Sequence, residues 1–195
     1  MKQKTDLRVI KTKKAIYDAF IRLMHSKGLN AMTVQDILDE ALINRKTFYT
    51  YFHDKYDLAE QIAAKYLNNF DAILAKRIPA DGSTPLEAFR IEELYSEFYE
   101  NRMDILAIWK IRTDRINVFD EMSKRLQKIY LQLAEYYDAP GNRQLQSYMF
   151  SNFVLTTYQH VLETDQNYET YQLLKEYQNL CDVIEKASKE YPTKT

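Results

Sequence analysis

Residues 33–55 read TVQDILDEALINRKTFYTYFHDK and decide the fold, because they predict two short helices joined by a tight turn. Thr33 suits the N-cap of the first helix, since its hydroxyl can accept a hydrogen bond from an orphan backbone N–H one turn in. The apolar residues of this helix recur at helical spacing and are Val34, Ile37, Leu38 and Ala41. The first helix is therefore expected to have one apolar face.

Asn44 is the candidate N-cap of the second helix. Phe48 and Phe52 are one helical turn apart and are expected to pack inward. The polar residues left for solvent or a partner are Arg45, Lys46, Thr47, Tyr49 and Thr50. In a helix-turn-helix, the helix after the tight turn enters the major groove of DNA, and basic and hydroxyl side chains such as these suit that role. A solvated helix face is the alternative explanation.

A further helix is predicted before this pair, with Gly28 as its expected stop, because glycine adopts the left-handed conformation without steric cost. Its apolar stripe consists of Ile16, Ala19, Phe20, Leu23 and Met24. Three helices can share a small core. The basic segment from Lys2 to Lys14 is expected to be frayed, and either lies along DNA or contacts nothing.

The charge of the chain is unevenly distributed. Residues 1–55 carry eleven Lys and Arg against six Asp and Glu, a formal charge of +5, so the total of −1 leaves −6 for residues 56–195. A basic head on an acidic body is the electrostatic signature of a phosphate-binding region, and the near-neutral total conceals it.

The N-terminal motifs resemble the DNA-binding domain of the TetR family of bacterial transcription regulators. The matching motifs are Thr12-x-x-Ala15-Ile16-x-x-Ala19-Phe20, Gly28, Thr33-Val34-x-x-Ile37 and Thr47-Phe48-Tyr49-x-Tyr51-Phe52-x-x-Lys55-x-x-Leu58. The last is the most specific, because it keeps the family pattern T-[LF]-Y-x-[HY]-F-x-x-K-x-x-L.

The resemblance implies a role in DNA binding for residues of both short helices. Phosphate contacts are implied for Thr47, Tyr49, Tyr51 and Lys55, base-edge contacts for Arg45, Lys46 and Thr50, and an approach to the backbone for the region of Thr33 and Gln35. The family usually has glycine where this chain has Leu42. A left-handed leucine costs on the order of 1 kcal/mol, so a turn of different shape is expected.

The remaining chain also predicts helices, and three glycines and four prolines suit an all-helical protein. The predicted helices are 55–78, 85–100, 102–113, 115–138, 142–163 and 168–190, with a linker at 79–85. The predicted fold is all-α. A three-helix head (residues 1–55) is joined by a long helix to a helical-bundle regulatory and dimerisation domain (residues 56–195).

The last two predicted helices carry more apolar and aromatic surface than one side of a helix can bury. The resemblance implies that they pair with their copies in a second subunit, and burial within the monomer is the alternative. The predicted interface residues are Tyr148, Phe153, Tyr158, Leu174, Tyr177 and Cys181.

The body is also expected to hold a pocket for a small-molecule effector, since mostly apolar residues with polar tips suit such a site. The candidate lining residues are Tyr95, Phe98, Tyr99, Met103, Trp109, Phe119 and Tyr130. Ordinary core packing is the alternative explanation for each of them.

No enzyme, cofactor or metal site is predicted. The three histidines lack metal-ligand spacing, three glycines cannot build a phosphate-binding loop, and no catalytic triad is recognisable. The single Cys181 excludes an internal disulfide and favours a cytoplasmic location. No apolar run of 18 residues is present, so no membrane partner is expected.

The sequence therefore predicts a homodimeric regulator that represses at a palindromic operator in double-stranded DNA and is released by a small ligand. One alternative is a TetR-like protein whose body binds a protein partner, as a co-activator contact or in chromosome organisation, without a small-molecule ligand. The other is a helical interaction module that does not bind DNA.

Overall fold

The computed structural model describes residues 7–75, 101–164, 166, 168 and 170–190. These residues form an all-α fold with no strand, apart from an isolated bridge between Arg112 and Asn117. The described helices are α1 (Leu7–Ser26), α2 (Gly28–Ala31), α3 (Val34–Ala41), α4 (Arg45–Tyr51), α5 (Lys55–Ala75), α8 (Arg102–Trp109), α9 (Val118–Tyr136), α10 (Arg143–Thr164) and α11 (Thr170–Glu190). The predicted fold class is confirmed. The predicted linker 79–85 and the helix 85–100 lie outside the described residues.

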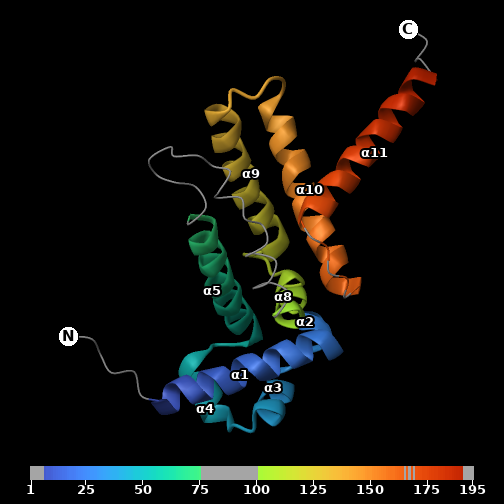
Figure 1. Cartoon of the computed structure of the whole chain (residues 1–195). Helices are drawn as coiled ribbons and strands as arrows, with labels where there is room; N and C mark the ends of the chain where they lie inside the picture. The colour runs from blue at the N-terminus through green and yellow to red at the C-terminus, as the bar shows by residue number, and fades with distance from the viewer. Residues whose placement is uncertain (1–6, 76–100, 165, 167, 169, 191–195) are drawn as a thin grey trace.

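Helices α1 to α4 form the head, with α1 lying across α3 and α4 (Figure 1). Ile16 and Phe20 of α1, Ile37 of α3 and Phe48 of α4 are fully buried in one core cluster. The predicted inward stripe is thus confirmed. The expected fraying is wrong for the described residues 7–14, because α1 already begins at Leu7.

The two caps predicted around the helix-turn-helix, Thr33 and Asn44, are present, and Asp54 provides a third. Thr33 forms a capping box with Asp36, whose backbone N–H donates to the Thr33 hydroxyl at 3.1 Å. Asn44 accepts from the Thr47 N–H at 2.8 Å, and Asp54 accepts from the N–H groups of the first turn of α5. The hydrogen bond from Lys27, followed by those from Thr33, lowers the pKa of Asp36 to about 2. These caps satisfy orphan N–H groups of three successive helices.

Leu42 ends α3 in the left-handed conformation, with φ 54° and ψ 44°. The turn therefore keeps a left-handed residue where the family has glycine, and the expected change of shape does not occur at this residue. Its side chain is 92 % exposed, so it contributes little burial to offset the backbone strain. Gly28, with φ 73°, is the other left-handed residue of the head, at the predicted stop of α1.

The body is built on α5, α9 and α10, with α8 at its base (Figure 1). Helices α9 and α10 lie side by side, and the hydroxyls of Ser123 and Ser151 are 3.0 Å apart between them. Arg125 of α9 donates to Asp71 of α5 at 2.8 Å. The buried side chains of these helices continue the core cluster of the head.

The predicted helix 102–113 ends early, at Trp109. The Thr113 hydroxyl accepts from the N–H groups of Arg115 and Ile116, at 3.2 and 3.1 Å, and so offers the backbone a turn instead of a helix. Asn117 then caps α9. The predicted helices 115–138, 142–163 and 168–190 correspond to α9, α10 and α11 with shifted ends.

Helix α11 crosses α10 and projects beyond the bundle (Figure 1). The rings of Phe153 and Tyr177 meet at the crossing, with centroids 4.5 Å apart. None of the α11 side chains described is buried, and Leu174, Leu180 and Val183 are more than half exposed. Within the chain, α11 therefore leaves much of its apolar surface uncovered. Among the described helices, none is long and apolar enough to cross a membrane.

Replacing Leu42 with glycine should raise the free energy of unfolding by up to about 1 kcal/mol, because glycine removes the left-handed strain and little burial is lost. Urea denaturation of both proteins measures the change. Leu42→Ala is the control, since alanine keeps the Cβ and hence the strain. Equal stabilisation by alanine and glycine would contradict the explanation.

Candidate DNA-binding face and ligand cleft

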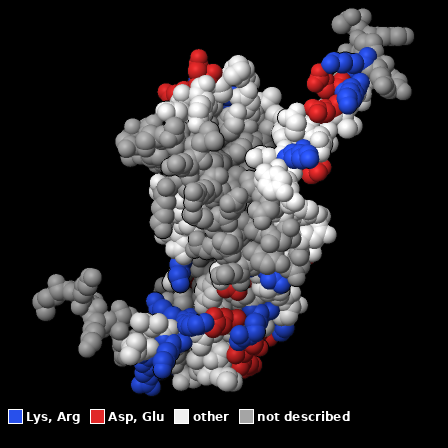
Figure 2. All heavy atoms as spheres, in the orientation of Figure 1, with Lys and Arg blue, Asp and Glu red and all other residues white. Residues whose placement is uncertain are grey.

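The short helix α4 carries most of the residues predicted to contact DNA. Arg45, Lys46, Tyr49 and Thr50 are exposed, whereas Thr47 and Tyr51 are half-buried. On the face shown in Figure 2, Lys and Arg gather over the lower part of the molecule, where the head lies. The structure thus brings the predicted residues of this helix together beside a basic surface.

Several of these side chains already have partners within the head. The Thr47 hydroxyl donates to Asn44, and the Thr50 hydroxyl donates to the Lys46 carbonyl, both at 2.9 Å. The Arg45 guanidinium lies 5.8 Å from the centre of the Tyr49 ring, within cation–π range. These contacts hold the side chains in place and leave their outer edges exposed.

Lys46 and Lys13 differ in how they are held. Among the described residues, the Lys46 ammonium has no hydrogen bond or ion pair, so it is available to a phosphate. The ammonium of Lys13 on α1 lies 5.4 Å from the centre of the Tyr51 ring, which itself packs against the core. Sequence reasoning did not single out Lys13, because a ring contact between α1 and α4 requires the fold.

Helix α3 contributes little positive charge. Thr33 and Gln35 are exposed, and Gln35 donates to Asp39 at 2.8 Å. Nearby cations are paired with acids of the same helix: Lys27 with Asp36 at 2.6 Å, and Arg22 with Glu40. The positive charge of the proposed DNA-binding face therefore comes mainly from α1 and α4.

Lys55 is held inside the head. Its ammonium donates to the carbonyls of Leu29, Asn30 and Met32, at 2.9, 2.9 and 2.7 Å. These bonds use all three ammonium protons and satisfy carbonyls at the end of α2. The resemblance implies a phosphate contact for Lys55, whereas this geometry favours a role in positioning the head.

Lys55→Met should lower the free energy of unfolding by about 1–3 kcal/mol, because carbonyls bonded to a charged donor lose their partner. The salt dependence of DNA binding should stay unchanged. Lys46→Met is the matched control and should leave stability unchanged while reducing the slope of log K against log[salt] by about 0.9. Urea denaturation and gel-shift titrations at several salt concentrations measure both. A reduced slope for Lys55→Met would restore its phosphate contact.

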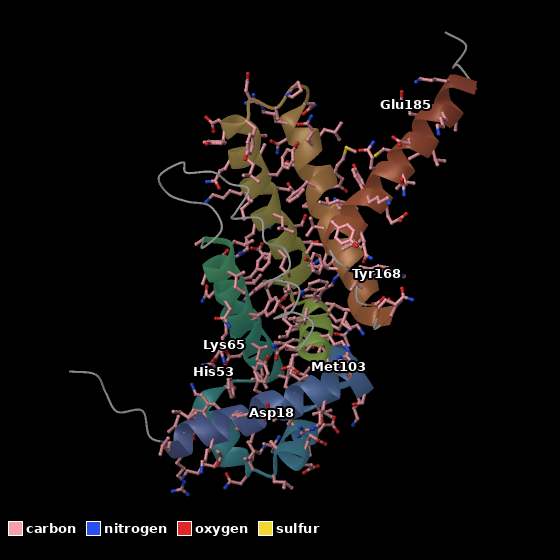
Figure 3. The ribbon with its side chains drawn as sticks, in the orientation of Figure 1. Asp18, His53, Lys65, Met103, Tyr168 and Glu185 are labelled. Carbon is pink, nitrogen blue, oxygen red and sulfur yellow. The ribbon has the colours of Figure 1, made fainter. Side chains whose placement is uncertain are left out.

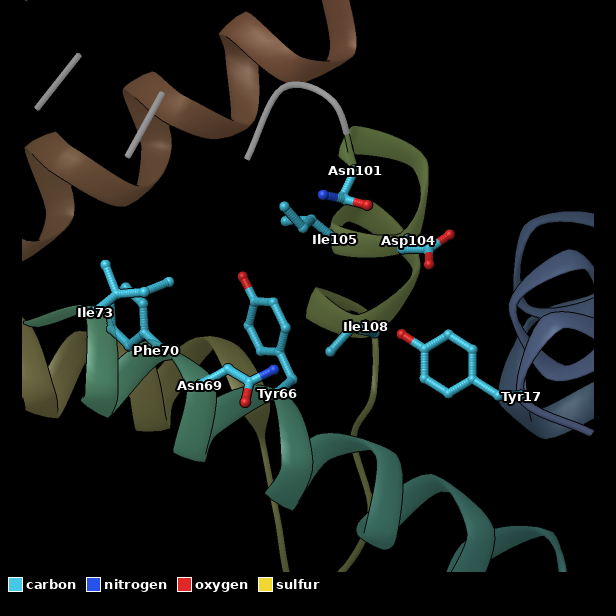
Figure 4. Close-up of a pocket in the computed structure, with 9 residues that line it drawn as sticks. All are labelled: Tyr17, Tyr66, Asn69, Phe70, Ile73, Asn101, Asp104, Ile105 and Ile108. Atoms are coloured by element: carbon cyan, nitrogen blue, oxygen red, sulfur yellow. The ribbon is translucent and has the colours of Figure 1, made fainter. Parts of the chain in front are cut away.

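A cleft of about 240 Å³ opens where α1, α5 and α8 meet (Figure 4). Tyr17 comes from the head, and the other lining residues come from α5, α8 and the N-cap residue of α8. Its main residues are Tyr17, Tyr66, Phe70, Asp104, Ile105 and Ile108. Head and body thus share the walls of one cavity.

The polar groups of the cleft are partly shielded from water. The Trp109 indole N–H donates to the Tyr66 hydroxyl at 3.0 Å, and burial raises the pKa of Tyr66 above its usual value. Burial, followed by the charges of Asp104 and Asp18, raises the pKa of Tyr17 to about 12. Burial, then Asp18, also raises the pKa of Asp104. Both phenols are therefore neutral hydrogen-bonding groups at neutral pH.

The structure does not gather the predicted pocket residues into this cleft. Tyr95, Phe98 and Tyr99 lie outside the described residues. Met103 is 55 % exposed beside α1, where its carbonyl is 2.8 Å from His25 Nε2 (Figure 3).

The other predicted pocket residues pack elsewhere. Trp109 and Phe119 meet edge to face, 5.9 Å apart, and Tyr130 lies against Phe150 with 5.3 Å between centroids. Trp109 reaches the cleft only through its hydrogen bond to Tyr66. Sequence reasoning missed Tyr17 because it lies in the head, outside the predicted body.

The predicted dimer residues fall into three groups. Tyr148 and Leu174 are 59 % and 53 % exposed, and Tyr177 is 37 % exposed. Phe153 and Cys181 are half-buried. Tyr158 packs against the core of its own chain and lines a small apolar cavity with Trp109, so we leave it out of the proposed interface.

Comparison with known proteins agrees with the helix-turn-helix geometry. Residues 16–62 match the family model of bacterial regulatory proteins, tetR family. The uncharacterised HTH-type transcriptional regulator YvkB of Bacillus subtilis is 29 % identical over 97 residues, which are 50 % of each chain. An uncharacterised HTH-type regulator of Haemophilus influenzae is 37 % identical over 73 residues, 37 % of this chain and 36 % of that protein. The match therefore spans half or less of these relatives.

Solved structures extend the similarity of the fold over most of the chain. A Clostridium perfringens regulator, provisionally assigned to fatty acid metabolism, has a TM-score of 0.63 at 18 % identity, covering 84 % of this chain and 94 % of that one. The regulatory protein TetR from Rhodobacter sphaeroides has a TM-score of 0.55 at 15 % identity, covering 77 % and 93 %. The capped helix pair and the match over residues 16–62 show that this part of the chain is a helix-turn-helix of the tetR family of bacterial regulatory proteins, and the solved structures share the fold of most of the chain.

Proposed function

We propose that the protein is a homodimeric transcription regulator that represses at a palindromic operator and releases it when a small ligand binds. The observation that supports release by a ligand is the cleft that the head and the body share. Tyr17 lines it from α1, whereas Asp104 and Tyr66 line it from α8 and α5. A ligand that entered this cleft would contact the DNA-binding head directly.

The surrounding contacts provide a path from the cleft to the head. Helix α8 is held to α1 by His25, whose Nε2 lies 2.8 Å from a carbonyl of α8. The loop after α8 is held to α5 by Glu60, which accepts from Thr113 at 3.1 Å and from Arg115 at 3.3 Å. A ligand that shifts α8 would therefore change where the head sits on α5. Such a ligand acts by favouring one of two head arrangements.

The cleft favours this ligand mechanism over a body that only binds a protein partner. A largely apolar cavity with a few convergent polar groups is the usual form of a small-molecule site. A body that serves only protein contact needs no such cavity.

Filling the cleft should imitate the ligand. Ile73 is half-buried on the α5 wall, and Ile73→Trp places a larger side chain there without changing the head. We expect operator affinity to fall about tenfold, or about 1.4 kcal/mol, in gel-shift titrations. Ile73→Leu is the control and should bind normally. A folded Ile73→Trp protein with unchanged DNA affinity would contradict control of the head by this cleft.

The dimer is proposed from the surface that α10 and α11 leave uncovered. Tyr148 and Met149 of α10 and Leu174, Leu180 and Ile184 of α11 are all more than half exposed. Exposed apolar surface on two adjoining helices is typical of a protein–protein interface. We propose an isologous two-fold contact that buries at least about 2,000 Å², as obligate dimers do. The two heads would then reach half-sites about 34–36 Å apart.

Leu174→Glu should split the dimer, because it places a charge in a desolvated apolar contact. Sedimentation velocity should show a dimer for the wild-type protein and a monomer for the variant. Selection from random DNA should return an inverted repeat with the wild-type protein and lose it with the variant, although the head is unchanged. Gln172→Glu adds the same charge at a polar site of α11 and is the control. A wild-type monomer that selects a single half-site would refute the dimer and the palindrome together.

A further inference from the structure

The cleft between α1, α5 and α8 has an apolar side and a polar side, and this arrangement limits which ligands fit. Phe70, Ile105 and Ile108 are each at most 4 % exposed and form an apolar side. Asp104 and the Tyr17 hydroxyl lie on the side nearest α1 (Figure 4). A ligand that fits both sides has a hydrocarbon or aromatic part and a group that suits a carboxylate.

Among the described residues, no basic side chain is bonded to Asp104. Its carboxylate has no hydrogen bond or ion pair among the described residues, although it is half-buried. The nearby basic side chains have other contacts. Lys14 is paired with an acid of its own helix at 2.8 Å, and His25 Nε2 lies 2.8 Å from a backbone carbonyl of α8. The Lys65 ammonium lies over the Tyr17 ring, 5.6 Å from its centre. A half-buried carboxylate without a partner favours a cationic ligand.

The two tyrosines strengthen this preference. Tyr17 lies near Asp104 on the side nearest α1 (Figure 4), the Tyr66 ring lines the same cleft, and the face of an aromatic ring attracts cations. Burial and the charge of Asp18 raise the pKa of Asp104, so a cation placed beside it would stabilise the charged form. A ligand carboxylate would instead repel Asp104.

We propose that the cleft binds a small organic cation, with its ammonium group beside Asp104 and its hydrocarbon or aromatic part against Phe70 and Ile105. The proposal rests on the proposed function, in which this cleft is the effector site. The cavity of about 240 Å³ is smaller than the roughly 300–1,000 Å³ of drug-sized sites. One ring with a short chain is therefore a suitable probe.

Three probes of nearly equal shape test the charge preference: phenethylammonium, neutral phenylethanol and anionic phenylpropionate. Isothermal titration of the full chain without DNA should show at least about tenfold tighter binding of phenethylammonium than of phenylethanol. Phenylpropionate should bind most weakly. Asp104→Asn keeps the side-chain shape and should remove the preference. Asp114→Asn, an exposed carboxylate outside this cleft, should keep it.

A second measurement, operator release in gel shifts, separates this proposal from the proposed function. Preferential binding of phenethylammonium that leaves DNA affinity unchanged would support the ligand class and refute the ligand-controlled release. Release by phenylethanol or phenylpropionate, with no preference for the ammonium, would refute the ligand class and leave the ligand-controlled release standing. Equal or absent binding of all three probes at millimolar concentration would also overturn the ligand class, as would a cation preference unchanged in a folded Asp104→Asn protein.

Discussion

The anchoring of α5 in the head is the constraint on which the rest of the structure depends. This one uninterrupted helix begins at Lys55, whose ammonium is bonded to three carbonyls at the end of α2. Leu58 and Ile62, in the next turns, are buried in the core that the head shares with the body. Because an α-helix is stiff along its axis, the direction of α5 and the orientation of the head cannot vary independently.

Helix α5 is also bonded to the body at two positions along its length. Glu60 is bonded to the loop after α8, and Asp71 accepts from Arg125 of α9. Helix α8 is much shorter and lies between α1 and α5, where the cleft opens. Of the elements at this junction, α8 has the fewest residues to re-pack if it moves. It is therefore the element through which a bound molecule would reach the head at the smallest energetic cost.

The sequence predicted the head well because its signals are local. Thr33, Asn44 and Asp54 act as caps within three residues of themselves, and Phe48 and Phe52 follow helical spacing, so each could be inferred without the fold. The prediction failed at the C-terminal end of α8. The early end of α8 depends on a hydroxyl at Thr113 that captures two N–H groups, which a helical pattern does not reveal.

The cleft was not predictable in the same way, because its walls come from segments distant in the sequence. Tyr17 and Asp104 are brought together only by the packing of α8 on α1. Aromatic residues in the body, such as Tyr130, instead fill space between α9 and α10. A search for aromatic residues in the body cannot distinguish a cavity wall from filled core, since both use the same residue types.

Helix α11 shows why a single chain gives an incomplete account of the molecule. A helix in water gains most of its stability from packing an apolar face, yet none of the α11 side chains described is buried. In the proposed dimer, the partner supplies that packing and so also fixes the distance between the two α5 helices through α10 and α9. A spacing fixed in this way makes DNA binding sensitive to small movements of each head, because both must meet successive major grooves at once. In this proposal, a cleft as small as the one beside Asp104 would be sufficient for control, since a ligand would need only to misalign two heads that the proposed dimer holds at a set separation.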